Sequence, residues 1–219
     1  MFVGHTALAL AAKRRTPKLS LAWLFAAAAG LDLLWPILLV LGVERVSVPP
    51  NGTGFTRLVF DSYPWSHSLV MAMVWSGVAF GIATVLKRTR GEAVMLALLV
   101  FSHWALDFLT HVSDLPLWPS LNAPQVGLRL WDHTGATLAL ETLLFGWGLW
   151  HYTRATRPRD RTGVYAFWGF ALVQFGLWAG TPFGPPPPSA VAVAWSSLVA
   201  MWLLVAWAGW ADRHREPRG

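Results

Sequence analysis

The order of apolar and polar positions divides most of the chain into six long apolar runs separated by shorter polar connectors. The runs are Leu19–Leu41, Trp65–Leu86, Gly91–Val112, Thr134–Thr153, Gly163–Gly180 and Ala190–Ala211. At about 1.5 Å of rise per residue, a helix over each run is about 27–35 Å long. The hydrocarbon core of a bilayer is about 30 Å thick, so each run is long enough to span it. The pattern predicts an all-α, polytopic membrane protein with six transmembrane helices.

A shorter apolar segment, Met1–Ala12, precedes these runs. As a helix it is about 18 Å long, which is too short to span a bilayer. Its basic residues follow the apolar part, which is the reverse of a secretory signal peptide. We expect either a half-helix that runs from mid-bilayer to the cytoplasmic surface or an amphipathic helix on that surface. The whole chain, residues 1–219, is then a single membrane domain.

The basic residues indicate the orientation in the membrane. Only 13% of the residues are charged, against about 25% in a typical soluble domain. Fourteen of the 17 Lys and Arg form clusters next to apolar runs: Lys13, Arg14, Arg15 and Lys18; Lys87, Arg88 and Arg90; Arg154, Arg157, Arg159 and Arg161; and Arg213, Arg215 and Arg218. These clusters alternate along the chain with connectors that hold only three basic residues, Arg45, Arg57 and Arg129.

By the positive-inside rule, the clusters and both termini lie in the cytoplasm, as expected for a bacterial inner-membrane protein. The net charge of +6 and the isoelectric point of about 10.5 thus reflect membrane topology. The expected partners are membrane lipids, and nucleic acid is not among them. The chain has no Cys, which excludes disulfides, thiolate metal sites and cysteine nucleophiles.

Ionisable residues are concentrated in the apolar runs of residues 1–153, whereas the last two runs, within 163–211, contain no charged residue and no His. Each charge at the centre of a transmembrane helix costs roughly 2.5–3.5 kcal/mol on insertion scales, so such residues indicate function. The clearest pattern is His103, Asp107 and His111, which stand four residues apart on one helix face. Imidazole and carboxylate groups one turn apart can share a divalent metal ion.

Two further positions, Asp32 and Glu141, place carboxyl groups inside the apolar runs. Asp32 lies in mid-run before Pro36, where we expect a kink that either lines a cavity or holds an interhelical hydrogen bond. Glu141 follows His133 and Thr137 at four-residue spacing, and a carboxyl group at that depth is protonated, paired with a cation or bound to metal.

His67 begins the second run after Pro64. The free N–H groups of that first turn, with the hydroxyls of Ser66 and Ser68, can hold an anion such as phosphate. The other interpretation is an ordinary interfacial His beside Trp65. Counted at about 1.5 Å per residue, four helices deliver polar groups to one layer, and that layer is open toward the outside.

These motifs resemble those of bacterial membrane-bound proteins described as metal-dependent hydrolases. The shared features are Gly4-His5, the mid-helix Asp32, Ser66-His67-Ser68 and Ser102-His103-x-x-x-Asp107. The order of His, Asp and Glu residues is also similar to that of zinc-dependent phospholipase C and related nucleases. The resemblance implies a multi-zinc phosphoesterase site with the ligands His5, Asp32, His67, His103, Asp107, His111 and Glu141.

The chain departs from the soluble enzymes at Thr137, where they have a His four residues before the final Glu. They also suggest an Asp between Asn51 and Phe60, which is missing here. Zinc is the expected metal because imidazole is the main donor, with manganese or magnesium as alternatives.

We therefore expect a membrane-embedded, metal-dependent hydrolase that acts on a phosphoester of a lipid or a lipid-linked substrate. Asp32 is the expected catalytic residue, as a metal ligand that also acts as a base. The alternative is an ion- or proton-coupled transporter, because Asp, Glu and His chains also build proton relays. Transporters usually contain two related halves, and the last two runs lack such polar groups.

Overall fold

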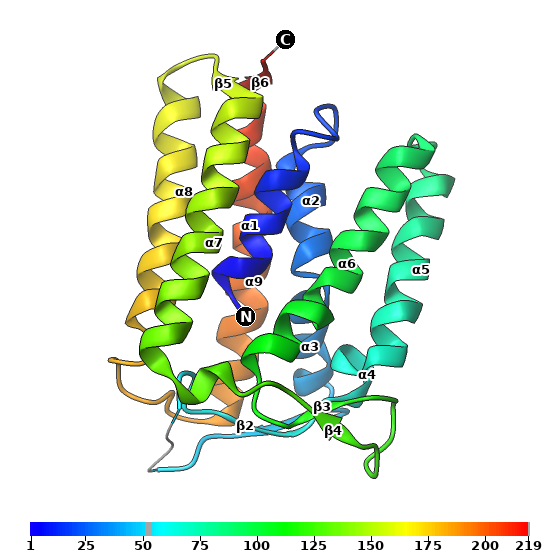
Figure 1. Ribbon diagram of the computed structural model, residues 1–219, viewed down its shortest axis with the longest axis vertical. Coiled ribbons are helices and arrows are strands. Elements are labelled where there is room, and N and C mark those ends of the chain that lie inside the picture. The colour runs from blue at the N-terminus through cyan, green and yellow to red at the C-terminus, as the bar shows by residue number, and fades with distance from the viewer. Residues whose placement is uncertain (51–53, 219) are drawn as a thin grey trace.

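The computed structural model describes residues 1–50 and 54–218 and is predominantly helical (Figure 1). The helices in these residues are α1 (Val3–Ala12), α2 (Leu21–Ala28), α3 (Gly30–Val40), α4 (Pro64–His67), α5 (Leu69–Val85), α6 (Arg90–Thr110), α7 (Thr134–Ala155), α8 (Arg161–Gly180) and α9 (Ala190–Arg213). Every predicted apolar run is helical over most of its length. The predominantly helical fold is thus confirmed. The interval between Asn51 and Phe60, where an Asp was expected, begins outside the described residues.

Three short antiparallel ribbons lie in the connectors, where the apolar pattern predicts no strands. They pair β1 (Arg45–Ser47) with β2 (Val59–Ser62), β3 (Leu115–Pro116) with β4 (Gln125–Val126), and β5 (Thr156–Pro158) with β6 (Arg215–Pro217). A 3₁₀ turn over Leu130–Asp132 precedes α7. Segments of two to four residues carry too few side chains for an alternating pattern to stand out.

The basic clusters all lie at one end of the bundle. Figure 1 shows the α1–α2 loop, the α5–α6 loop and the β5–β6 ribbon at one end, and ribbons β1–β4 at the other. The predicted alternation of basic and non-basic connectors is therefore present in the fold. We call the first the basic end and the second the ribbon end.

Fewer helices qualify as membrane spans than the sequence predicts. Three helices, α6, α8 and α9, are long and apolar enough, and the bent pair α2 and α3 gives up to four. Helix α5 has only 17 residues, because the second run breaks at Ser68, and α7 is long enough at 22 residues but is not apolar enough. The fold supports three to four spans by length and composition, and not six.

The first run bends at a different place from the one predicted. The axes of α2 and α3 meet at 62°, with the break at Ala29, whereas Pro36 lies inside α3. Ala29 leaves the helical conformation, with φ −96° and ψ 16°. The carbonyl of Ala28 at this break accepts a hydrogen bond from His103 Nδ1 at 2.8 Å. The break is thus stabilised by a polar side chain from another helix, which local sequence rules cannot foresee.

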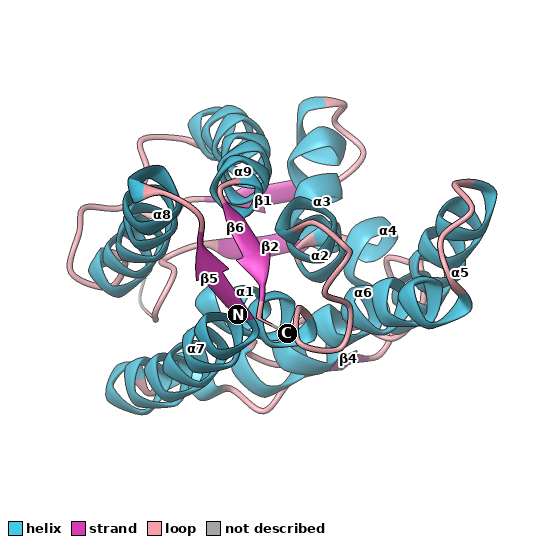
Figure 2. Cartoon of the chain, turned by 90° about the horizontal axis from the view of Figure 1, so that it is seen from above, coloured by secondary structure: helices cyan, strands magenta, loops and turns pink. Residues whose placement is uncertain are grey.

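Helix α1 lies inside the bundle, next to α7, α2 and α6 (Figures 1 and 2). Eight of its ten residues are buried: Val3, Gly4, His5, Thr6, Ala7, Ala9, Leu10 and Ala12. The surface amphipathic helix is therefore wrong, because burial extends around most of the helix and leaves no polar face in water. The half-helix that starts at mid-height agrees with the structure.

A buried ionic network fixes the basic end. Lys13 Nζ donates to Asp212 Oδ2 at 2.7 Å, and the hydroxyl of Tyr152 donates to Asp212 Oδ1 at 2.6 Å. Arg215 is also buried and donates to the carbonyl of Gly163 at 3.0 Å. Two members of the basic clusters thus hold α1, α7, α8 and α9 together. A buried charge pair needs such additional hydrogen bonds to offset its desolvation.

Helices α1 and α7 approach each other closely at Gly148. A Cβ on Gly148 would lie 2.6 Å from both the Cα and the carbonyl oxygen of Ala7. Small residues allow such close approach of backbones in helix bundles. Since α1 also carries His5, this contact helps to set the position of that imidazole.

We predict that Gly148→Ala destabilises the protein by about 1–3 kcal/mol, because the backbone of α1 must move away. The measurement is the midpoint of thermal unfolding in detergent. The matched control is Gly146→Ala in the same helix, where a Cβ meets no atom within 4 Å. Equal midpoints for the two variants would contradict the close packing of α1 against α7.

Candidate metal centre

Five of the predicted site residues meet in the interior of the bundle. His5 comes from α1, Asp32 from α3, His67 from the last position of α4, and His103 and Asp107 from α6. All except Asp32 are at least 96% buried, and the Asp32 side chain is 27% exposed. Residues separated by about 100 positions in the sequence are therefore direct neighbours.

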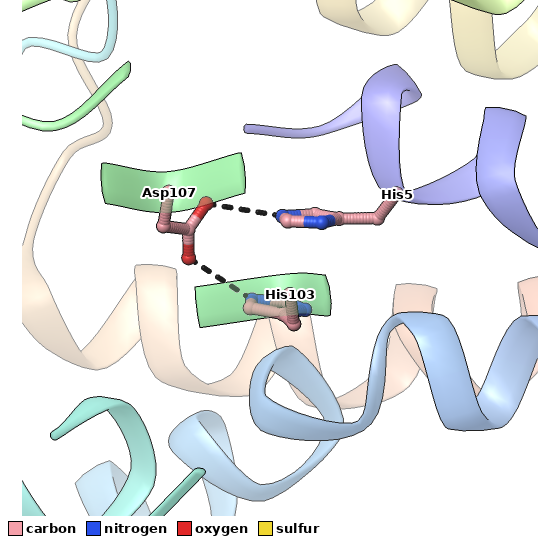
Figure 3. Close-up of side chains that lie close together, drawn as sticks. All are labelled: His5, His103 and Asp107. Carbon is pink, nitrogen blue, oxygen red and sulfur yellow. Dashed lines mark hydrogen bonds and ion pairs between the residues drawn. The ribbon is translucent and has the colours of Figure 1, made fainter. Parts of the chain in front are cut away.

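The first group consists of His5, His103 and Asp107. Asp107 lies at the edge of both imidazoles and contacts each with one oxygen: its Oδ1 is 3.1 Å from His5 Nε2, and its Oδ2 is 3.1 Å from His103 Nε2 (Figure 3). The two rings are stacked, with centroids 3.7 Å apart and an interplanar angle of 7°. One ligand atom from each residue lies within 4.8 Å of the other two, so the group could hold a metal ion.

The second group consists of Asp32, His67 and His103. Asp32 Oδ1 is 3.5 Å from His67 Nε2 and 3.7 Å from His103 Nε2. These three residues also satisfy the 4.8 Å criterion. Since His103 belongs to both groups, and His67 Nε2 is 3.8 Å from Asp107 Oδ2, the five side chains form one continuous cluster.

The surroundings of the imidazoles fit a metal centre. The Nδ1 atoms of His103 and His67 contact the Ala28 carbonyl at 2.8 Å and the Ser66 hydroxyl at 2.7 Å. This arrangement turns both Nε2 atoms toward the carboxylates, as is usual for metal-binding His. His5 Nδ1 is buried and has no hydrogen-bond partner among the described residues, and His103 Nε2 makes ion-pair contacts with Asp107 and Asp32 but no well-directed hydrogen bond there. Imidazole and carboxylate donors suit zinc and several other divalent ions.

Glu141 lies beside this cluster and outside both groups. Its Oε2 accepts hydrogen bonds from the backbone N–H of Phe2 at 2.9 Å and of Gly4 at 3.2 Å. A carboxylate is favourable at the N-terminus of a helix, and here it holds the start of α1. The amino group of Met1 contacts Asp107 in the same region. The other oxygen of Glu141, Oε1, has no hydrogen-bond partner in the described part of the chain.

His111 does not continue the stripe of His103 and Asp107. Helix α6 ends at Thr110, and His111 is extended, with φ −60° and ψ 148°. Its Nδ1 contacts Asp114 at 3.0 Å and the hydroxyl of Tyr63 at 3.2 Å, so it belongs to neither group. The four-residue spacing predicts a common face only where the helix continues.

The other residues of the α7 stripe are also away from the cluster. His133 is exposed at the N-terminal cap of α7, and Thr137 donates to the carbonyl of Leu130 at 2.7 Å. Thr137 therefore helps to fix the start of α7.

The start of α4 does not offer an anion site, in contrast to the prediction. The carboxylate of Glu44 occupies it: Oε1 accepts from the N–H groups of Trp65 and Ser66, each at 2.8 Å. Oε2 accepts from the Ser66 hydroxyl at 2.6 Å. The free N–H groups of this turn are thus satisfied by a carboxylate from the same chain.

Glu44 supports the cluster through Ser66 and was missed in the sequence. It lies in the connector after α3 and is 2% exposed. Burial raises the pKa of its carboxyl above the usual value, and the hydrogen bonds from Ser66 and Trp65 oppose that shift. The sequence does contain one signal: the N–H groups at the start of a helix after Pro64 favour a negative group, which can be a ligand or a carboxylate of the chain itself. Only the ribbon β1–β2 brings Glu44 to them.

A cavity of about 330 Å³ adjoins the cluster. Asp32, His67, Asp107, His111 and Glu141 line it together with apolar and aromatic side chains, among them Phe2, Trp35, Phe55, Phe60, Trp131 and Trp178. Helices α8 and α9 complete the wall with Leu177, Val193, Ser196 and Ser197. The apolar runs of these two helices contain no charged residue and no His, yet they shape the space next to the cluster.

Comparisons with known proteins leave this site to be judged on its geometry. No protein-family model matches the chain, and neither a curated protein nor a solved structure matches it.

We predict that the purified protein binds at least about one equivalent of a divalent transition metal, measured by elemental mass spectrometry after incubation with zinc or manganese and removal of excess metal. His103→Ala should abolish most of this binding because His103 belongs to both groups. His133→Ala, which removes an exposed imidazole, should retain the wild-type content. A wild type that binds no metal, or a folded His103→Ala variant with full occupancy, would contradict the metal centre.

Proposed function

We propose that the protein is embedded in a bacterial inner membrane with its basic end in the cytoplasm. The apolar helices α6, α8 and α9 and the bent pair α2 and α3 support this proposal. Exposed apolar side chains point the same way, such as Leu143 on α7, Leu172 on α8 and Leu203 on α9, each at least 63% exposed. Large exposed apolar surfaces of this kind need a lipid or protein partner.

In this arrangement α5 and α7 complete six passes. Helix α7 places Glu141 in the interior, where it accepts a hydrogen bond from the start of α1, and this polar residue lowers the hydropathy of α7. The short helix α4 directly precedes α5. Both termini, with the four basic clusters, then lie on the cytoplasmic side.

We further propose that the protein is a metal-dependent hydrolase acting on a phosphoester of a lipid or a lipid-linked substrate. The observation that carries this proposal is a buried His and Asp cluster with two overlapping groups of possible ligands next to an aromatic cavity. The likeness of its motifs to those of membrane-bound metal-dependent hydrolases agrees with it. Ligand sites are commonly apolar cavities with a few convergent polar groups.

His5, His103 and Asp107 would hold one divalent ion, or Asp32, His67 and His103 would hold it instead, because the Nε2 of His103 can bind only one ion at a time. Such an ion lowers the pKa of a bound water toward about 7 and neutralises charge on phosphate oxygens. The Ala28 carbonyl and the Ser66 hydroxyl orient the two imidazoles and fix which nitrogen faces the cluster.

Asp32 is the residue that we propose to act as the base. Its side chain is 27% exposed, whereas that of Asp107 is 2% exposed, so Asp32 can contact both the cluster and a molecule in the cavity. A carboxylate in that place can accept a proton from water as the water oxygen bonds to phosphorus, while the bond from phosphorus to the ester oxygen breaks and the alcohol group leaves. The apolar walls formed by Trp35, Trp131 and Trp178 would accommodate acyl or prenyl chains and exclude bulk water.

The alternative, an ion- or proton-coupled transporter, would use the same residues as a relay. The successive separations of 3.1–3.8 Å from His5 through Asp107 and His103 to Asp32 and His67 are compatible with it. Hydrolysis and transport differ in outcome: the first releases phosphate or a headgroup, and the second moves ions across vesicles.

We predict that Asp32→Asn lowers the rate of chelator-sensitive phosphoester hydrolysis by at least about a hundredfold, because it keeps the volume and removes the base. The assay offers lipid phosphoesters in detergent or liposomes with zinc or manganese. The control is Asp61→Asn, which changes an exposed carboxylate outside the cavity and should keep the wild-type rate.

Hydrolysis that survives chelator, Asp32→Asn and His103→Ala would show that the chemistry lies elsewhere. Ion flux in proteoliposomes that is abolished by His103→Ala, without hydrolysis of any substrate tested, would favour the transporter.

We predict the orientation from single cysteines, which are unambiguous because the chain has none. Pro17→Cys and Gly91→Cys lie on exposed positions at the basic end, and a Cβ on Gly91 meets no atom within 4 Å. They should react with an impermeant thiol reagent only after cells are opened. Ser120→Cys, at the ribbon end, should react in intact spheroplasts. The reverse labelling pattern, or labelling of all three in spheroplasts, would rule out this orientation.

A further inference from the structure

A second hollow lies toward the basic end of the bundle. It is a groove of about 740 Å³ between α1, α6 and α7. Its apolar lining comes from Leu8, Ala11, Met95, Leu98, Leu99 and Trp147. Leu98 is 57% exposed and Trp147 is 44% exposed, so the groove opens to the surroundings of the protein.

Basic groups lie at one end of this groove. Arg14 and Arg15 line it, and both are exposed. Within residues 1–50 and 54–218, neither arginine forms an ion pair, in contrast to the buried Lys13 of the same cluster. His151 also lines the groove, with its ring 4.6 Å from those of Trp147 and Trp150. The groove thus combines an apolar channel with two unpaired positive charges at its mouth.

This combination matches one class of ligand. We propose that the groove binds an anionic phospholipid of the cytoplasmic leaflet, with its phosphate at Arg14 and Arg15 and an acyl chain along Leu8, Ala11 and Leu98. Basic pockets between helices on the cytoplasmic side commonly bind anionic headgroups. Arginine suits phosphate because its planar guanidinium can donate two parallel hydrogen bonds.

The proposal rests on the proposed membrane insertion and is independent of the hydrolase. The groove and the cavity beside the cluster share no lining residue. Helix α1 connects them, because its start lies at Glu141 and its end carries Arg14 and Arg15 into the next loop. A lipid held in the groove would therefore stabilise the helix that supplies His5.

The experiment is a titration of the detergent-purified protein, followed by native mass spectrometry. Two lipids with the same acyl chains, phosphatidylglycerol and phosphatidylcholine, separate headgroup charge from chain binding. The wild type should prefer phosphatidylglycerol by at least about tenfold, and Arg14→Ala with Arg15→Ala should remove that preference. The control double variant Lys18→Ala with Arg161→Ala removes two exposed charges from the same end outside the groove and should keep it.

Filling the groove without changing its charge tests the acyl chain. Ala11→Phe should lower the affinity for both lipids by about tenfold, and Leu98→Trp, on the exposed face of α6, serves as a second filling variant should the first unfold. The proposal is overturned if the control weakens binding as much as the Arg14 and Arg15 variant does. Unchanged lipid binding by both filling variants, displacement of the lipid by inorganic phosphate, or a second protein copy in place of lipid would also overturn it.

Failure of this proposal and failure of membrane insertion give different results. A chain that does not insert would fail the cysteine labelling test, whatever its behaviour toward lipids. If only the lipid proposal is wrong, the labelling pattern and the metal content stay as expected.

Discussion

The rest of the structure depends on the contacts of the buried carboxylate of Asp107 with the stacked imidazoles of His5 and His103. A buried carboxylate is costly unless positive groups, hydrogen bonds or a metal ion compensate it. Here His5 of α1 and His103 of α6 supply part of that compensation. The half-helix must therefore enter the bundle, and the small residues Gly148 and Ala7 let it approach α7 closely enough to do so.

Other irregular parts of the fold serve the same cluster. The break at Ala29 offers a carbonyl to His103, and the turn of α4 presents His67, with Ser66 and Glu44 behind it. In a membrane, non-regular backbone is tolerated only where protein or a cavity surrounds it; here His67 of the α4 turn lines the cavity, and His103 covers the break at Ala29. The helices are interrupted at the points that orient His103 and His67.

The two ends of α1 have different environments. Its start is fixed by the hydrogen bonds from Phe2 and Gly4 to Glu141, and its end by the ion pair of Lys13 with Asp212. Because both anchors are buried, a change at either end can shift His5. This gives a physical basis for coupling between the lipid groove that we propose at the basic end and the cluster.

The sequence by itself determined the helical runs, the alternation of basic connectors and the pair His103 and Asp107, because each depends on local spacing along one helix. It also indicated that Asp32, His103 and Glu141 lie at a similar depth. Only the tertiary structure decided that Glu44 covers the start of α4, that Glu141 holds α1, that His111 leaves the stripe and that α8 and α9 wall the cavity. These contacts join segments far apart in the chain, and hydrophobic periodicity carries no information about which distant partner satisfies a buried polar group.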